Sequence, residues 1–337
     1  MRLTIKHIAQ MAGVSNATVS RVINNRDAGV GEDTRQRIKQ IIREQGYRIN
    51  VIAKSMVTRR TNSIGLIIPD VSNPFFSDIA KSVEATAEAS GFTVFLCNSD
   101  DTLERERRYI SALGDRGVDG IVLVPASIGT REPDDLGFIV PVVLMDRPLS
   151  GRNVGVYIDN AHGEYLATEL LIKEGHRKLA FCGGLRSDHN VANRFKGFRQ
   201  ACSDYGIEVN EDTCLFGEFT VQAGISHSEQ IAVMDVSACV CANDLIALGL
   251  IAGLKKFGKL VPNDISVTGF DNILLSEINS PSITTVRQPT IEMGAIATRM
   301  LFDLIEKPEL KILSKVFQTE LVIRDSTRPF PASQPSL

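Results

Sequence analysis

The sequence predicts a small all-α head followed by a larger α/β body of two similar lobes, and three observations support this. Residues 1–62 hold 12 Lys and Arg against 4 Asp and Glu, although the whole chain has a net charge of −3. Apolar residues recur at helical spacing through the first 46 residues. Beyond Thr61, short apolar runs alternate with amphipathic segments for about 250 residues. A basic unit on an acidic body indicates a polyanion partner for the head alone.

Length and composition limit the class of protein. A chain of 337 residues suits about two to three packed units, and its apolar content of 43% is typical of a soluble globular protein. Residues 1–12 lack the apolar stretch of a signal peptide, and no segment has the roughly 18 apolar residues of a membrane span. The six cysteines show no C-x-x-C spacing, so we expect free buried thiols, no metal and no cofactor. These features predict a cytoplasmic protein with no membrane partner.

Three helices are predicted in the head, each with an apolar stripe facing inward. A tight turn at Gly13 separates the first two, Ser15 is a good N-cap for the second, and the third runs from about Glu32 to Gln45. The predicted inward residues are Ile5, Ile8, Ala9 and Ala12 in the first helix, Val19, Val22 and Ile23 in the second, and Ile38, Ile41 and Ile42 in the third.

Two short helices joined through "AGVS" predict a helix-turn-helix, whose second helix enters the DNA major groove with its N-terminus first. Small or polar side chains on that helix can approach base edges, and Arg21 can contact guanine or a phosphate. The alternative is an unrelated three-helix bundle with a basic surface. The candidate DNA-binding residues of this unit are Thr4, Lys6, Ser15, Asn16, Ala17, Thr18, Ser20, Arg21 and Asn24.

The segments "TIKHIAQMAGVSNATVSRVIN" and "TRQRIKQIIREQGYRINVIAKSM" resemble the head of the LacI family of bacterial repressors along its whole length. The resemblance implies a sequence-specific transcription regulator, associated with the nucleoid, that binds near-palindromic double-stranded operator DNA as a homodimer. It also implies a hinge that becomes helical on the operator and pushes an apolar side chain into the minor groove. The hinge residues it implies are Asn50, Ala53, Lys54 and Met56.

Three positions depart from the family pattern. Met56 stands where the family has a leucine, so we expect the DNA kink to survive with softer geometry. Ile49 replaces the usual proline before the hinge, which makes entry into the hinge less rigid. Gly31 replaces a serine cap on the third helix, at a cost of a few tenths of a kcal/mol.

The strand–helix alternation predicts parallel sheets of right-handed βαβ units, and its length suits two Rossmann-like lobes. The resemblance agrees, because LacI-family bodies are similar to periplasmic sugar-binding proteins of type I. On that analogy the chain crosses between lobes near Asp159–His162, near Gln288–Thr290 and around Phe317. The expected boundaries are a head at 1–48, a hinge at 49–61, a body at 62–330 (lobe 1 at about 62–159 and 290–316, lobe 2 at about 162–287 and 318–328) and a disordered tail at 329–337.

Ligands of open α/β sheets bind beyond the carboxyl ends of the strands, and this rule selects candidate residues without the resemblance. They supply carboxylates, amides, guanidinium groups and aromatic rings, the mixture that recognises sugar hydroxyls and C–H faces. The resemblance favours a small sugar or polyol over a purine. The candidate effector-binding residues are Asn73, Phe75, Phe76, Asp146, Arg147, Asp188, Arg194, Phe219, Asn243, Asp271 and Gln288. Structural alternatives remain open: the two phenylalanines as core, Arg194 in a surface ion pair, and the neighbouring Asp244 as a helix cap.

No P-loop, G-x-S-x-G or H-E-x-x-H motif is present, so an enzyme is not expected. Asp146 and Asp271 could form an acid–base pair, but Arg147 and Arg194 are expected to hold both carboxylates ionised, which suits binding rather than proton transfer. The prediction is therefore a sugar-controlled repressor of sugar-uptake or catabolism genes. One alternative is a catabolite regulator driven by a phosphocarrier protein, and a less favoured one is a sugar-binding protein without a regulatory role.

Overall fold

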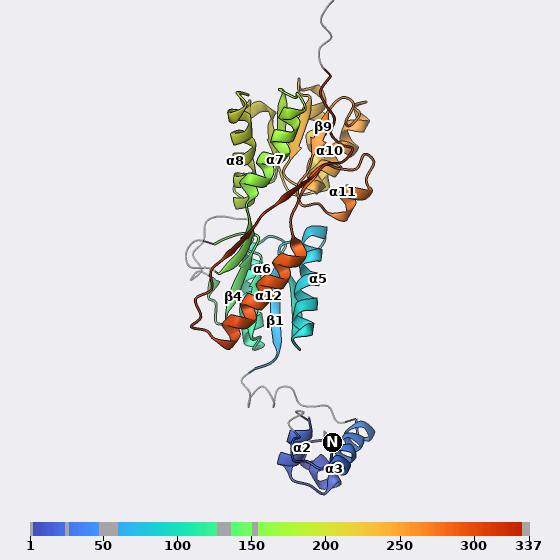
Figure 1. Cartoon of the computed structure of the whole chain (residues 1–337), viewed down its shortest axis with the longest axis vertical. Helices are drawn as coiled ribbons and strands as arrows, with labels where there is room; N and C mark the ends of the chain where they lie inside the picture. Colours follow the sequence, from blue (N-terminus) through green and yellow to red (C-terminus); the bar gives the residue numbers. More distant parts are fainter. Residues whose placement is uncertain (1–2, 24–26, 47–59, 127–135, 150–153, 332–337) are drawn as a thin grey trace, which may run out of the picture. The chain divides into compact units, whose positions relative to one another are not determined.

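The computed structural model describes residues 3–23, 27–46, 60–126, 136–149 and 154–331. The chain divides into two compact units, a head (Met1–Thr61) and a body (Asn62–Leu337), coloured blue and cyan to red in Figure 1. Among the described helices, none is long and apolar enough to cross a membrane.

The head contains three helices, and local capping groups set where they begin and end. The amide of Thr4 donates to Nδ1 of His7 at 3.1 Å, at the start of the first helix. Gly13 follows that helix with a φ of 64°, and Oγ of Ser15 accepts from the amide of Thr18 at 3.1 Å in the next. The helices are α1 (Ile5–Ala12), α2 (Asn16–Ile23) and α3 (Glu32–Glu44).

Each helix of the head contributes one fully buried apolar side chain to a single core: Ile8, Val19 and Ile38. The predicted apolar stripes therefore meet, as a helix-turn-helix requires. The third helix begins after Gly31, as predicted, and ends at Glu44, one residue before the predicted end.

The first lobe of the body is a parallel six-stranded sheet in the order β11-β5-β4-β3-β1-β2. Alternate residues of β1 pack on opposite faces: Leu66 faces α5 and α12, while Ile67 faces α6. The elements are β1 (Ser63–Ile68), α5 (Pro74–Ala89), β2 (Thr93–Asn98), α6 (Leu103–Asp115), β3 (Gly120–Leu123), β4 (Val142–Met145), β5 (Gly155–Ile158), α12 (Thr290–Glu306) and β11 (Lys315–Phe317).

The second lobe is a parallel four-stranded sheet in the order β7-β6-β8-β9. Phe181 packs toward α7 and α8 on one face, and Cys182 packs toward α9 and α10 on the other. The elements are α7 (Asn160–Lys173), β6 (Leu179–Gly183), α8 (His189–Asp204), η2 (Glu211–Thr213), β7 (Cys214–Phe216), α9 (Val221–Val233), β8 (Ala238–Cys241), α10 (Asp244–Lys256), β9 (Ser266–Thr268) and α11 (Leu274–Ile278).

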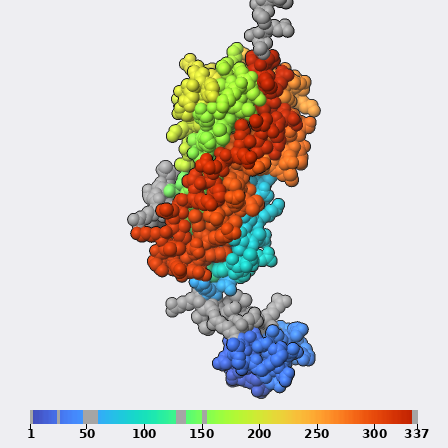
Figure 2. All heavy atoms as spheres, viewed as in Figure 1, coloured from blue at the N-terminus to red at the C-terminus, as the bar shows by residue number. Residues whose placement is uncertain are grey.

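The chain passes between the lobes at three places: between β5 and α7, between β10 (Thr285–Arg287) and α12, and between β11 and β12 (Glu320–Val322). Strands β10 and β12 pair antiparallel beside these passages. Phe317, expected at a crossing, is the last residue of β11 and pairs with Ile158 inside the first sheet. The end of the chain, in orange and red, covers the same face of both lobes (Figure 2).

The ordered chain extends further than predicted. The amide of Phe330 donates to the carbonyl of Glu174 at 2.8 Å, and the Phe330 ring packs 5.5 Å from the ring of His176. The prediction of a disordered tail from residue 329 is therefore wrong for residues 329–331, because an apolar side chain and a backbone bond fix them to the body. Residues 332–337 lie outside the described part of the chain.

Glycines allow helices α9 and α10 to approach closely. A Cβ at Gly249 would lie 2.0 Å from the carbonyl oxygen of Val221, and one at Gly224 would lie 2.1 Å from that of Ile246. Backbone atoms cannot move aside as a flexible side chain can, so these positions require glycine.

We predict that Gly249→Ala lowers the free energy of unfolding of the body by about 3 kcal/mol, because the helices must separate to admit one methyl group. Thermal unfolding followed by circular dichroism measures the effect. The control is Ala252→Ser on the exposed face of the same helix, expected to stay within about 0.5 kcal/mol of wild type. An equal loss in both variants would contradict the proposed close contact.

Candidate functional site

The exposed side of helix α2 is the candidate DNA-reading surface. Asn16, Ala17 and Arg21 are exposed there, while Thr18 and Ser20 are half-buried. Small side chains near the helix start leave room for base edges, and Arg21 near its end can reach a base or a phosphate.

Other predicted DNA-binding residues have structural duties or lie outside the described residues. Ser15 and Thr4 cap their helices, and their hydroxyl groups already have partners within the head. Lys6 is exposed on α1. The residues outside the described ranges are Asn24, Asn50, Ala53, Lys54 and Met56.

A cavity of about 410 Å³ lies between the carboxyl ends of the two sheets. Ten of the eleven predicted effector residues line this cavity, and they come from both lobes. The exception is Gln288, which lines a neighbouring cavity and donates from Nε2 to Oδ1 of Asp271 at 2.6 Å. Gln288 therefore positions Asp271 from behind.

Helix N-termini converge on this cavity, and side chains cap them. Asn73 accepts from the amide of Phe75 at 3.1 Å, and Asn243 accepts from the amide of Ile246 at 2.9 Å. Oδ1 of Asp188 accepts from the amides of Asn190 at 2.7 Å and Val191 at 3.1 Å. These predicted binding residues thus also determine where α5, α10 and α8 begin.

Arg147 joins the two lobes at the cavity wall. It follows strand β4 of the first lobe and is 7% exposed at its side chain. Its Nη1 donates to Oδ1 of Asp101 at 2.9 Å and to the carbonyl of Pro125 at 3.0 Å. Its Nη2 lies 3.2 Å from Oδ2 of Asp188, which belongs to the second lobe. The guanidinium group is therefore shared between carboxylates of both lobes.

Arg194 is held entirely within the body, so the surface ion pair considered from the sequence is wrong. Its Nε donates to Oδ1 of Asn160 at 2.8 Å, and its Nη1 donates to the carbonyl of Ala242 at 2.5 Å. The guanidinium lies 3.7 Å from the ring centre of Phe270 and 3.6 Å from Oδ1 of Asp271. A side chain with this many buried contacts presents a fixed edge to the cavity.

Contrary to the expectation that Arg147 and Arg194 keep both central carboxyls ionised, the pKa of each carboxyl is raised rather than lowered. Burial raises the pKa of Asp271 to about 8 and raises the pKa of Asp146, although Arg147 and Arg194 act to lower the pKa of Asp146 and Arg194 that of Asp271. The loss of hydration outweighs the nearby positive charges, because both carboxyls are almost inaccessible to water.

Several polar atoms at the cavity wall have no hydrogen-bond partner in the described chain. They are Oδ1 of Asp146, Oδ2 of Asp188 and Nε of Arg147. All three side chains are buried. Unsatisfied buried polar atoms are costly, so a ligand or ordered water that supplies hydrogen bonds at these points is favoured.

Backbone strain gathers at the same place. Asp146, Asp271, Asp100 and Asp101 all line the cavity and have positive φ values of 66°, 109°, 48° and 53°. Such a conformation in a residue other than glycine costs on the order of 1 kcal/mol and is concentrated at functional sites.

Phe75 and Phe76 line the cavity and also belong to the core of the first lobe, with ring centres 5.0 Å apart. The core and binding interpretations of these rings are thus compatible. Phe219 lines the cavity from the second lobe. The neighbouring Asp244 is not the cap of α10, because its fully buried carboxylate accepts from the amide of Ile273 at 2.9 Å and from the hydroxyl of Thr285 at 2.6 Å.

Sequence reasoning missed several cavity residues. The carboxyl-end rule could have found Asp70 after β1 and both Asp100 and Asp101 after β2, because each lies two or three residues beyond the end of its strand. Glu218 and Asn190 lie in segments that only the folded chain brings to the cavity.

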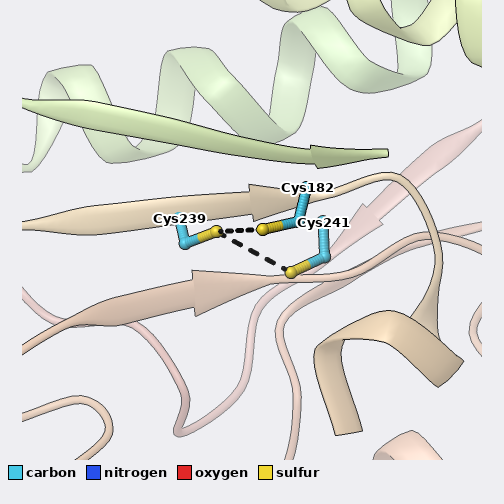
Figure 3. A group of neighbouring side chains, drawn as sticks. All are labelled: Cys182, Cys239 and Cys241. Carbon is cyan, nitrogen blue, oxygen red and sulfur yellow. Dashed lines mark hydrogen bonds between the residues drawn. The ribbon is translucent and has the colours of Figure 1, made fainter. Parts of the chain in front are cut away.

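Three thiols gather in the core of the second lobe (Figure 3). The Sγ of Cys239 lies 3.4 Å from that of Cys182 and 4.0 Å from that of Cys241. Their spacing would allow a soft metal ion, but all three are fully buried among apolar residues of α9 and α10. A metal–thiolate group there would need an entry path and hydrogen bonds to its sulfur atoms, so the close packing of buried cysteine side chains explains the arrangement better.

Comparisons with known proteins agree with this architecture. Residues 4–50 match the model of bacterial regulatory proteins, lacI family, and residues 168–327 match a periplasmic binding protein-like domain. The chain is 36% identical to the HTH-type transcriptional regulator RegA of Clostridium saccharobutylicum, over 97% of this chain and 100% of that protein. It is 33% identical to the ribose operon repressor of Halalkalibacterium halodurans (96% and 97%) and 35% identical to the repressor PurR of Vibrio vulnificus (96% and 98%).

Solved structures of regulators are also similar to this chain. A LacI family regulator of Enterococcus faecium with bound ribose is 31% identical with a TM-score of 0.73, covering 80% of this chain and 100% of that one. The transcriptional regulator CelR in complex with cellobiose is 31% identical with a TM-score of 0.72, covering 96% and 100%. The lac repressor dimer bound to operator, at 23% identity, a TM-score of 0.86 and coverage of 97% and 100%, confirms the predicted fold class.

A buried acid beneath the cavity predicts a pH dependence of stability. Glu164 in α7 is fully buried, neither of its carboxyl oxygens has a hydrogen-bond partner, and burial raises its pKa to about 8. Folding therefore takes up a proton at Glu164 between its unfolded pKa near 4.5 and pH 8, so its contribution makes stability fall as the pH rises through that range.

We predict that Glu164→Gln raises the stability of the body at pH 8 by on the order of a few kcal/mol, and that the gain disappears near pH 4.5. Melting temperatures measured across this range test it, with the exposed Glu208→Gln as a control that shows no such trend. A gain that is independent of pH would mean that Glu164 is not neutral in the folded protein.

Proposed function

This chain belongs to the LacI family of bacterial transcription regulators, and on that basis we propose that it is a repressor controlled by a small sugar bound between the two lobes of its body. The DNA-binding part of this function rests on the family and on the helix-turn-helix head. The sugar and its mode of action are inferences from the cavity.

The unsatisfied buried atoms of the cavity wall carry the proposal. Asp146 and Asp188 offer acceptors, and Nε of Arg147 offers a donor. A hydroxyl group both donates and accepts, so adjacent hydroxyl groups of one sugar complement such a mixed set. A sugar that fits gives each of these buried polar atoms a hydrogen-bond partner. A ligand that lacks one of the hydroxyl groups leaves an atom unpaired and binds more weakly, and this difference is the source of specificity.

The size and the apolar surface of the cavity support the same ligand class. Its volume of about 410 Å³ falls within the range of small-molecule sites. Phe75, Phe76 and Phe219 add aromatic surface from both lobes, against which the C–H face of a sugar ring can pack. The related structures with bound ribose and cellobiose support this inference by analogy.

The coupling to DNA follows from the position of the cavity. A ligand that contacts both lobes favours one arrangement of the lobes over another. The first lobe begins with β1 at Ser63, immediately after residues 49–61 in the sequence, so a shift of that lobe can act on this segment. We infer that this change forms or melts the hinge helices, with Asn50, Ala53, Lys54 and Met56 as the hinge contacts. Effector and operator then alter each other's affinity by the same factor.

A homodimer is part of the proposal, since two heads read two halves of a near-palindromic operator. Exposed apolar side chains on both lobes support it. Phe95 and Leu96 are 44% and 48% exposed on the edge strand β2, and Leu274 and Ile278 are 66% and 67% exposed on α11. Apolar surface of this kind is a common part of subunit interfaces.

We further propose that the protein is not an enzyme and that it acts on the chromosome in the cytoplasm. The functional carboxyls adjoin a cavity whose polar atoms suit binding. The proposed location follows from the proposed DNA target, since bacterial chromosomal DNA lies in the cytoplasm.

A purine effector is the second candidate, because repressors named PurR are 34–35% identical to this chain. Phenylalanines at the cavity could stack on a purine ring as well as on a sugar. The two candidates separate in a thermal-shift panel of pentoses, hexoses, disaccharides, polyols and purine bases. Response to a phosphocarrier protein, with no response to the panel, would instead favour a partner-controlled regulator.

We predict that Asp271→Ala weakens binding of the sugar found in that panel by about 100-fold, because Arg194 and the sugar hydroxyls both lose their partner. Operator affinity without sugar should stay within about twofold, because the head is untouched. Calorimetry and operator titration measure the two effects. The exposed Asp303→Ala is the control. Loss of operator binding by the sugar-free variant would count against the assigned role.

We predict that Arg21→Ala weakens operator binding by about 10- to 100-fold and relaxes the preference at one base pair of each half-site. A competition assay with singly substituted operators measures both effects. Arg43→Ala at the end of α3 is a matched loss of one positive charge. An equal, sequence-independent loss in both variants would place Arg21 on the phosphate backbone instead of on a base.

A further inference from the structure

We propose that the cavity selects an uncharged sugar and rejects its phosphate ester. This inference rests on the proposed function and adds the charge class of the ligand. It follows from the balance of charges, from the contacts that both arginines already make, and from the side chains that occupy the helix N-termini.

Acidic residues outnumber basic ones around the cavity. Arg147 and Arg194 are its two basic lining residues in the described chain. Three acidic residues lie deep in the wall, and four are half-buried or exposed at its edge. The seven are Asp146, Asp188 and Asp271 in the wall, and Asp70, Asp100, Asp101 and Glu218 at the edge.

Protonation does not remove the excess of negative charge. Burial raises the pKa of Asp271 and of Asp146, so neither carboxyl is counted as negative here. Of the other five carboxyl groups, Asp100 pairs with Arg105 outside the cavity lining, and the remaining four still outnumber the two guanidinium groups. A phosphate dianion therefore enters a negative region, where repulsion between like charges weakens its binding.

Neither arginine offers a phosphate two neighbouring nitrogens that are both free of protein contacts. Arg147 contacts Asp101, Asp188 and the carbonyl of Pro125. Arg194 is bonded to Asn160 and the carbonyl of Ala242, and it lies against Asp271. Phosphate binding by arginine normally uses two parallel N–H groups on neighbouring nitrogens. Here Nη1 and Nη2 of Arg147 and Nε and Nη1 of Arg194 already contact protein groups, so every such pair includes a nitrogen that is already engaged.

The helix N-termini, which elsewhere bind phosphates, are occupied too. Phosphate sites at helix starts depend on free backbone N–H groups. Here Asn73, Thr220 and Asn243 accept from amide groups in the first turns of α5, α9 and α10. At α8 the carboxylate of Asp188 accepts from two amides and is itself the anion bound by that helix. A phosphate would have to displace it.

The remaining unsatisfied atoms also suit an uncharged ligand. Oδ1 of Asp146 has no hydrogen-bond partner, and Oδ2 of Asp188 has only its ion pair with Arg147. A hydroxyl group can donate to a carboxylate or accept from a protonated carboxyl, whereas a phosphate dianion only accepts. An ester group placed against either ionised carboxylate would leave an acceptor facing an acceptor.

The test uses the full chain and four pairs of probes: D-ribose, D-xylose, D-glucose and cellobiose, each with its terminal monophosphate ester. Calorimetry at 0.05 M and 0.5 M salt gives the dissociation constants. For the sugar that binds, we expect its ester to bind at least about 100-fold more weakly at low salt. We also expect the gap to narrow at high salt, because the repulsion is screened.

Edge variants test the cause of the selectivity. Asp70→Asn and Glu218→Gln should each strengthen ester binding by about two- to fivefold, while the distant, exposed Glu208→Gln should not. An ester that binds as tightly as its sugar would overturn this inference and leave the proposed function standing. Failure of every sugar and every ester to bind would overturn the proposed function and, with it, this inference.

Discussion

The body depends on one buried ion pair that spans its two lobes. Arg147, two residues after the end of strand β4, lies 3.2 Å from Asp188, which caps helix α8 of the opposite lobe. Both side chains are almost inaccessible to water, and separating such a pair leaves two buried charges uncompensated, at a cost of about 3–5 kcal/mol. The cavity is therefore built around a contact that already holds the lobes together. A ligand that adds hydrogen bonds beside this pair only has to shift the equilibrium between arrangements of the lobes. It does not have to bring the two lobes together.

The surroundings of that pair are strained and incompletely bonded, which is typical of a binding site rather than of a core. Asp146 and Asp271 have positive φ values, and Asp146 leaves one carboxyl oxygen without a partner. Folding alone does not satisfy these groups, so a ligand can do so with a gain in free energy. The acidic cavity and the basic head also keep the two functions apart, because DNA is attracted to one unit and repelled by the other.

Much of this arrangement could be predicted because it depends on local order along the chain. The apolar stripes of the head, the caps at Ser15 and Gly31, and the carboxyl ends of parallel strands are all properties of short segments. The predictions that were wrong concern contacts between segments that lie far apart in the sequence. Gln288 lies behind Asp271, Asp244 bonds to Thr285, and the pKa of Asp271 follows from burial by both lobes. No spacing rule contains that information, since burial and pairing are decided only by the assembled fold.

The central claim is that the cavity and the head share one equilibrium. The most direct test is to measure the affinity for the sugar with and without saturating operator DNA, and the affinity for the operator with and without saturating sugar. Linkage requires the two ratios to be equal, and this account predicts that they differ from one by at least about fivefold. If the sugar binds the cavity but both ratios equal one, the cavity does not control the head and the account is wrong.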